Sequence, residues 1–172
     1  QQLTYAQLDL CASQLAQHEN AFSSAGAITE IAHGPPSGPL RWRAPDDGTW
    51  TVYVAGTRLS GDNVKRPAPG GEGFAIDVFS SRATENFLRM FGEHLGALPR
   101  GSIGAYFHDS FEYTGDGTPG FFEQFRKRRG YDLARELPAF MGKGDADRVA
   151  RVKSDYRQTL DELLLENFVQ PL

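Results

Sequence analysis

Residues 102–120 have the sequence SIGAYFHDSFEYTGDGTPG, in which a short apolar run leads directly into a cluster of acidic side chains. The run 102–107 has the length of a strand and is apolar at successive positions, which is typical of a strand buried on both faces. Thr118 and Pro119 suit the N-cap and the first position of a following helix. The sequence therefore predicts a βα unit over about 102–130.

A second βα unit is predicted upstream, over about 74–97. Residues 74–80, FAIDVFS, form a short apolar run that only Asp77 interrupts. Ser80 or Ser81 is placed to cap a helix that ends near residue 95, with apolar residues recurring at helical spacing. Residues 57–73, which precede this unit, contain too many glycines and prolines for a helix or a strand. A loop of this length in a compact domain is usually functional or disordered.

The rest of the chain supplies further helices and strands. We expect a helix over 4–18, a short strand over 26–34, a β-hairpin over about 40–55, a short helix capped by Asp132, and a final helix over about 146–169. Strands that alternate with helices indicate an α/β fold with a parallel sheet. Because a closed eight-fold barrel typically needs about 250 residues, the 172 residues indicate part of a barrel or a small α/β domain.

The composition excludes several classes of protein. With 18 Lys and Arg against 22 Asp and Glu, the chain is mildly acidic, so no nucleic-acid partner is expected. No apolar run approaches the roughly 18 residues of a membrane span. The opening QQLTYAQLDL lacks the character of a signal peptide, and the single Cys11 rules out an internal disulfide.

The acidic cluster after the predicted strand is the first candidate site. It contains His108, Asp109, Glu112, Tyr113 and Asp116. Catalytic side chains collect at the carboxyl ends of strands in βα folds, and crowded or buried carboxyls have raised pKa values, as a general acid requires. The competing interpretation is that these acids cap the next helix or solvate a loop.

A second candidate segment is VKRPAPGGEGFAID, residues 64–77. Arg66 beside the glycine-rich turn is a candidate for binding an anion, although the segment is not a P-loop. Glu72 and Asp77 add two acids, and Asp77 is either hydrogen-bonded within the chain or directed at a ligand. We interpret the basic run 126–129 as a solvated helix end and the phenylalanines at 121, 122 and 125 as core.

Several of these motifs, taken in order, resemble glycoside hydrolase family 106, the α-L-rhamnosidase-like enzymes. The resemblance covers roughly residues 40–170. Its clearest part is FHDSFEYTGDGTPGFFEQFRKRRGYDLARELPAF, with a strand that ends in an Asp-Ser-aromatic-Glu motif. The other matching positions are Phe125, Arg128 or Arg129, Gly130, Tyr131, Asp132, Leu137 and Pro138, the segment 64–80, the hairpin residues Trp42, Pro45, Gly48 and Trp50, and Arg151, Asp155 and Thr159.

The resemblance implies a (β/α)8 TIM-barrel catalytic domain, of which residues 1–172 would be one partial region with an inserted hairpin. It implies inverting hydrolysis of terminal α-L-rhamnosides, often with calcium helping to hold the sugar, although no metal ligands can be assigned from it. Glu112 would be the general acid, and Asp109 would orient it, tune its pKa or contact the sugar. The residues expected to bind substrate are His108, Tyr113, Arg66, Glu72 and Asp77.

Inversion also needs a catalytic base, which we expect beyond Leu172, with Glu72 and Asp77 as less favoured internal candidates. The expected partners are a rhamnose-containing glycan or glycoside and the rest of the parent catalytic domain. A truncated barrel would expose an apolar face, so self-association is expected. By resemblance alone, the parent protein is expected to be periplasmic or secreted.

Three alternatives remain open at this point. The chain could belong to a barrel glycosidase with a different sugar specificity, because the acid motif does not define the pocket. It could be a carbohydrate-binding or scaffold fragment without catalysis, in which Glu112 would be dispensable for binding. It could also be an interaction domain that uses its C-terminal helix.

Overall fold

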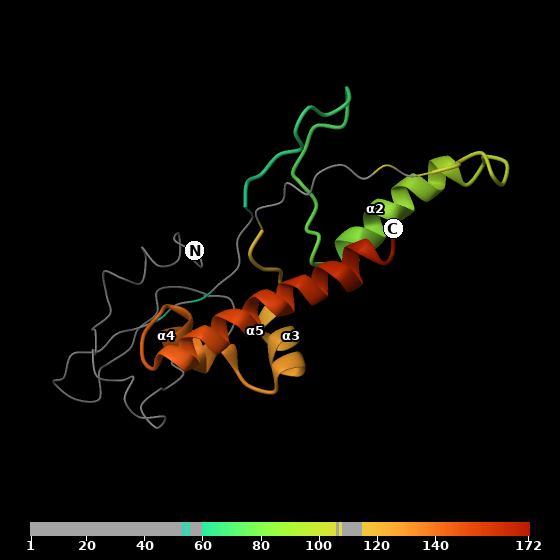
Figure 1. Ribbon diagram of the computed structural model, residues 1–172. Coiled ribbons are helices and arrows are strands. Elements are labelled where there is room, and N and C mark those ends of the chain that lie inside the picture. Colours follow the sequence, from blue (N-terminus) through green and yellow to red (C-terminus); the bar gives the residue numbers. More distant parts are fainter. Residues whose placement is uncertain (1–52, 54, 56–59, 106, 108–114) are drawn as a thin grey trace. The chain divides into compact units, whose positions relative to one another are not determined.

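The computed structural model describes residues 53, 55, 60–105, 107 and 115–172 (Figure 1). The chain divides into two compact units. Within the first, Gln1–Arg58 with Gly120–Thr159, the segment Gly120–Thr159 is called the α3–α5 unit below. The second, Leu59–Pro119 with Leu160–Leu172, is called the α2 unit. The predicted helix 4–18, strand 26–34 and almost all of the hairpin lie outside the described residues.

The α3–α5 unit is built from short helices packed on a long one. It contains α3 (Phe121–Arg129), the 3₁₀ turn η1 (Leu133–Glu136), α4 (Leu137–Phe140) and most of α5 (Ala146–Leu164). Its core is aromatic, because the Tyr156 ring lies 4.8 Å from that of Phe121 and 4.6 Å from that of Phe140. Phe121 and Phe125 are buried, which confirms that these two phenylalanines belong to the core, whereas Phe122 is half-buried.

The ends of these helices follow from local sequence signals. Gly130 adopts φ 77° and its N–H bonds the carbonyl of Arg126, so α3 stops where the cationic last turn and the glycine predict. Asp132 accepts the N–H of Ala134 and caps η1, also as predicted. The start of α3 differs from the prediction, because Gly120 in the left-handed conformation precedes the helix. Thr118 does not cap α3, since its hydroxyl bonds Asp77 instead.

The α2 unit combines an extended loop with packed helical segments. The loop, residues 62–75, is called the excursion below. It folds back on itself, with Val64 N–H bonded to Gly73 O at 2.9 Å and Ala75 N–H to Asp62 O at 2.8 Å. Ser80 then accepts the N–H of Ala83 and caps α2 (Ser81–Leu95), as predicted. The end of α5 continues as a π-helical turn, η2 (Leu165–Val169), which packs against α2. The buried residues described here are Val78, Phe79, Thr84, Thr118, Leu163 and Phe168.

The structure differs from the sequence prediction in the two apolar runs. Within 74–80 only Phe74 forms a β-bridge, to Asn63. Residues 77–80 form a turn in which the Phe79 N–H donates to the Asp77 carboxylate, so this N–H is not available to pair with a neighbouring strand. Residues 102–105 and 107 form no strand either, and Phe107 is 89% exposed. No neighbouring strand stands beside either run within the described residues. The strands predicted for these two runs are therefore not formed in the described residues, whereas the (β/α)8 barrel stays a prediction.

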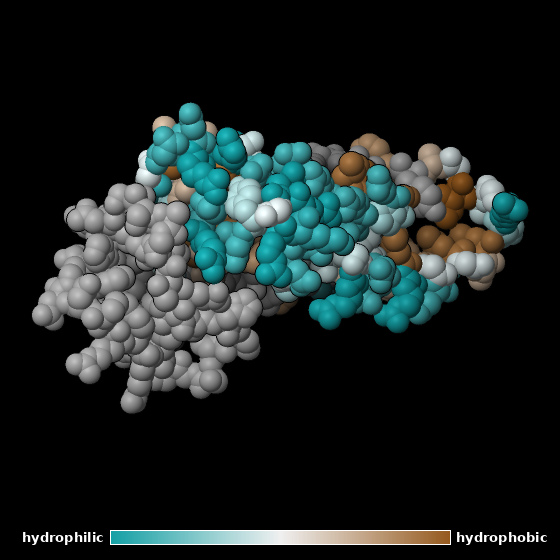
Figure 2. Space-filling model, turned by 90° about the horizontal axis from the view of Figure 1, so that it is seen from below, coloured by the Kyte–Doolittle hydropathy of each residue, from teal (hydrophilic) through white to brown (hydrophobic). Residues whose placement is uncertain are grey.

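Apolar side chains remain exposed on the α2 unit. Figure 2 shows hydrophobic atoms gathered where α2 and the segment after it lie. The exposed residues there are Met90, Phe91, Leu98 and Ile103. Such a surface is what the prediction of a partial domain requires. Among the described residues, no helix is both long and apolar enough to cross a membrane.

Candidate functional site

The residues expected to perform the chemistry, Asp109 and Glu112, lie outside the described residues, as do His108 and Tyr113. The structure does describe residues 115–119, which begin two residues after Tyr113. Asp116 in this segment is exposed and has an interaction partner, whereas Thr118 is 5% exposed. The segment after the predicted acids is therefore anchored at Thr118.

Asp77 provides this anchor. Its Oδ2 accepts a hydrogen bond from the Thr118 hydroxyl at 2.7 Å, and its Oδ1 accepts the N–H of Phe79 at 3.0 Å. Of the two interpretations of Asp77, the geometry matches the one in which it is hydrogen-bonded within the chain. A carboxylate oxygen has two acceptor sites, so contact with a sugar is still chemically feasible and stays a prediction.

The Phe79 ring forms a second contact with the same segment. A Cβ atom placed on Gly115 would lie 3.2 Å from Phe79 Cε2, so the backbone of Gly115 passes close to the ring. The Phe79 carbonyl in turn accepts a 2.7 Å hydrogen bond from Asn167 Nδ2 in η2. The chain after the predicted acids thus rests on a turn that is itself held by η2.

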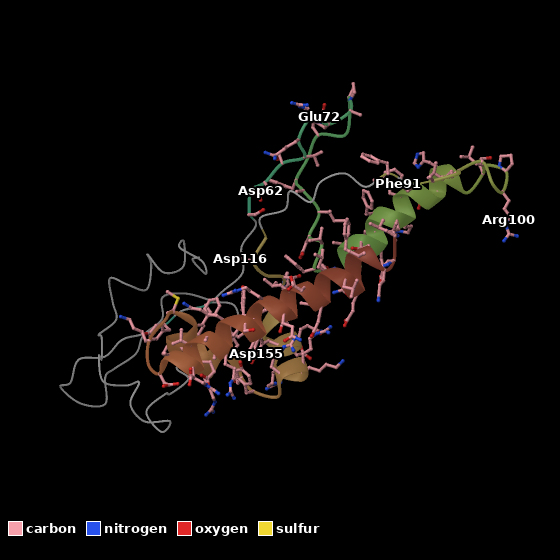
Figure 3. All side chains as sticks on the ribbon, viewed as in Figure 1. Asp62, Glu72, Phe91, Arg100, Asp116 and Asp155 are labelled. Carbon is pink, nitrogen blue, oxygen red and sulfur yellow. The ribbon has the colours of Figure 1, made fainter. Side chains whose placement is uncertain are left out.

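Arg66 and Glu72, the other described candidates, lie on the excursion 62–75. Both side chains are exposed. Figure 3 shows Glu72 far along the excursion and Asp116 away from it. Within the described part of the chain, no hydrogen bond or ion pair links Arg66 or Glu72 to Asp77. Arg66 has φ 50°, a left-handed conformation that costs a non-glycine residue about 1 kcal/mol. This is backbone strain of the kind often found at ligand-binding positions.

A polar cluster in the α3–α5 unit was not foreseen as a cluster from the sequence. The Tyr131 hydroxyl donates to Asp155 Oδ2 at 2.7 Å. Arg148 donates from Nε to Glu136 Oε2 at 2.9 Å and from Nη2 to Oε1, and its guanidinium lies 5.1 Å from the centre of the Tyr131 ring. Arg129 Nε donates to Thr159 Oγ1, which itself donates to the carbonyl of Asp155.

The electrostatics of this cluster favour a structural role. Burial, and then the hydrogen bond to Asp155, raise the pKa of Tyr131 above its ordinary range. The hydrogen bond to Glu136 raises the pKa of Arg148, which keeps the guanidinium charged. Neither group is poised to exchange protons near neutral pH. The signal for this cluster was present in the sequence, because Tyr131, Asp155 and Thr159 belong to the motifs that carry the family resemblance.

The side chains that the structure describes give no support to the expected calcium site. Calcium takes six to eight oxygen ligands, several of them carboxylates. Within 60–105 and 115–172 and the other described positions, no three His, Cys, Asp or Glu side chains converge on a possible metal position. Calcium binding therefore rests on the resemblance alone.

Comparison with known proteins identifies the class. The chain matches the alpha-L-rhamnosidase family, glycoside hydrolase family 106, over residues 9–172. It therefore belongs to this family of glycoside hydrolases. A curated relative, named "Putative beta-glucuronidase", from Formosa agariphila, is 30% identical over 149 residues. That alignment covers 82% of this chain and 13% of the relative, so the chain spans a small part of that protein's length. No solved structure matches the chain.

Proposed function

We propose that this chain forms part of the catalytic region of a glycosidase that hydrolyses terminal α-L-rhamnosides with inversion of configuration. The observation that carries the proposal is the family match over residues 9–172. The substrate is then a rhamnose-containing glycan or glycoside. The partner of this region is the rest of the catalytic domain, consistent with the apolar side chains exposed on α2 and after it.

In the proposed mechanism, Glu112 donates a proton to the glycosidic oxygen as the bond to the anomeric carbon breaks. Asp109 orients Glu112, tunes its pKa or contacts the sugar. A second carboxylate, about 6.5–9.5 Å away, removes a proton from the water that attacks the opposite face of the sugar. Asp77 already accepts two hydrogen bonds, and Glu72 lies on an exposed excursion. These contacts favour a base beyond Leu172.

A β-glucuronide is a second candidate substrate, because the relative from Formosa agariphila is named as a glucuronidase. A glucuronide carries a carboxylate that a neutral rhamnoside lacks. The forked guanidinium of Arg66 is suited to bind it, and the residue is exposed. An Arg66→Gln variant would then lose activity on the glucuronide alone.

The test compares p-nitrophenyl α-L-rhamnoside with p-nitrophenyl β-D-glucuronide, using the complete protein that contains this sequence. We expect turnover of the rhamnoside, with the β-anomer of rhamnose as the first product seen by NMR. Glu112→Gln should reduce kcat by about 10²–10⁴-fold, the usual contribution of acid catalysis. Glu85→Gln, at an exposed position of α2, is the matched control.

Each other outcome selects a different conclusion. Turnover of the glucuronide alone would replace the proposed substrate. Full activity of Glu112→Gln would refute the role of the acid. A folded protein that binds rhamnose by calorimetry but hydrolyses no glycoside would be a carbohydrate-binding fragment. The same titrations with calcium and with a chelator test the proposed metal, and cell fractionation tests the proposed export.

A further inference from the structure

The hydrogen bond between Asp77 and Thr118 joins two segments that are 41 residues apart in the sequence. One is the turn that leads into α2, and the other is the chain that follows the predicted general acid after a few residues. Thr118 is almost fully buried, so its hydroxyl has little access to water as an alternative partner. A buried hydroxyl that donates to a carboxylate makes a strong, directional contact.

The turn is well suited to hold another segment in place. Asp77 fixes the turn itself by accepting the Phe79 N–H, and the Phe79 carbonyl is bonded to Asn167. Ser80 then begins α2 by capping it. The Asp77 carboxylate thus belongs to a turn that has further hydrogen bonds besides the one to Thr118.

The segment after the predicted acid makes two contacts with this turn. Thr118 is bonded to Asp77, and Gly115 passes against the Phe79 ring. These contacts fix the chain from residue 115 to residue 118. Glu112 precedes Gly115 by three residues in the sequence, so the fixed segment begins shortly after the predicted acid. Catalysis is sensitive to such limits, because a displacement of about 1 Å can cost about 10²-fold in rate.

We infer that Asp77 is a positioning residue of this glycosidase, which holds the acid-bearing segment through Thr118 and does not itself bind the sugar. The inference rests on the proposed function. In this role Asp77 positions the chain next to the acid, in place of the substrate contact that the sequence predicts for it. The chemistry it requires is one hydroxyl at position 118 and one carboxylate at position 77.

The test uses Thr118→Val, which removes the hydroxyl and keeps the shape of the side chain, and Thr118→Ser, which keeps the hydroxyl. Thr84→Val is the matched control, because Thr84 is also buried in the α2 unit and its Oγ1 has no hydrogen-bond partner among the described residues. In the complete protein, Thr118→Val should lower kcat on the better aryl glycoside at least about tenfold, with KM within about twofold. Thr118→Ser should restore kcat, and Thr84→Val should leave it unchanged.

Asp77→Asn and the double variant separate positioning from binding. If Asp77 acts through Thr118, the double variant loses no more kcat than the worse single variant, because both changes break the same contact. If Asp77 binds sugar directly, Asp77→Asn raises KM while Thr118→Val does not, and the inference is overturned. It is also overturned if Thr118→Val behaves like Thr84→Val.

Hydrogen exchange of peptides covering 115–119, measured on the same variants, distinguishes failure of this inference from failure of the proposed function. Exchange should be faster in Thr118→Val than in Thr118→Ser or Thr84→Val. A wild-type protein with no glycosidase activity would overturn the proposed function and the catalytic part of this inference. Faster exchange in Thr118→Val would then still establish the contact, and unchanged exchange would refute it as well.

Discussion

The hydroxyl of Tyr131 lies 2.7 Å from Oδ2 of Asp155 and donates a hydrogen bond to it across 24 residues of sequence. This bond ties the chain just after α3 to the middle of α5. Both residues belong to the motifs that carry the family resemblance. Their contact indicates that these parts of the motif maintain the packing of helices, whereas the acid motif at 109–112 is the part expected to carry out the reaction.

Replacing Tyr131 with Phe should destabilise the protein. The substitution keeps the ring against Phe125, whose centre is 5.0 Å away, and removes only the hydroxyl. Asp155 then loses a charge-assisted hydrogen bond at a half-buried position, which is worth about 1–2 kcal/mol. Urea unfolding should show this loss. A double variant with Asp155→Asn should cost less than the sum of the single changes, and strict additivity would contradict the contact.

The same bond predicts how stability depends on pH. The pKa of Tyr131 is raised in the folded protein above its ordinary value of about 10. Its contribution to stability is therefore complete below about pH 10 and is lost as the pH rises further, because the unfolded chain releases the proton first. The free energy of unfolding of the wild type should fall more steeply above about pH 10 than that of Tyr131→Phe. Parallel curves would argue against the raised pKa.

Two buried threonines should respond oppositely to replacement by Val. Thr84 is 1% exposed and its Oγ1 has no hydrogen-bond partner among the described residues, so Thr84→Val should be neutral or stabilise by up to about 1 kcal/mol. Thr159 is fully buried and bonds both Arg129 and the Asp155 carbonyl. Thr159→Val should cost about 1–3 kcal/mol, because it leaves buried partners unsatisfied. Thermal unfolding of both variants measures these changes in stability. Equal shifts of Tm in the two variants would contradict the assigned hydrogen bonds.

Two glycines should likewise differ when replaced by Ala. Gly130 has φ 77° at the end of α3, a conformation that costs an alanine about 1 kcal/mol. Gly92 lies inside α2 with open space around the position of a Cβ atom. Gly92→Ala should therefore stabilise by about 0.5–1 kcal/mol through helix propensity. Denaturant midpoints measure both effects, and stabilisation by Gly130→Ala would refute the left-handed helix end.

The features that the sequence predicts correctly are local. Ser80, Gly130 and Asp132 mark helix ends because each acts on backbone groups within four residues, and the final helix follows from its apolar spacing. The strand predicted over 74–80 is wrong, because composition does not reveal that the Asp77 carboxylate stabilises a turn there. The Asp77–Thr118 and Tyr131–Asp155 bonds could not be predicted, because each pairs residues that only the folded chain brings together. The predicted acid pair, Asp109 and Glu112, lies outside the described residues and stays a prediction.

The π-helical turn at the end of α5 has a consequence for insertions and deletions. A π turn holds one residue more than an α turn, and here Gln170 N–H bonds the carbonyl of Leu165, five residues back. Removing one residue at Leu165 or Glu166 would restore α-helical pitch and rotate Asn167 by about 100° around the axis. Asn167 would then no longer point at the Phe79 carbonyl. The length of this segment, as much as its composition, maintains the anchor of the turn before α2.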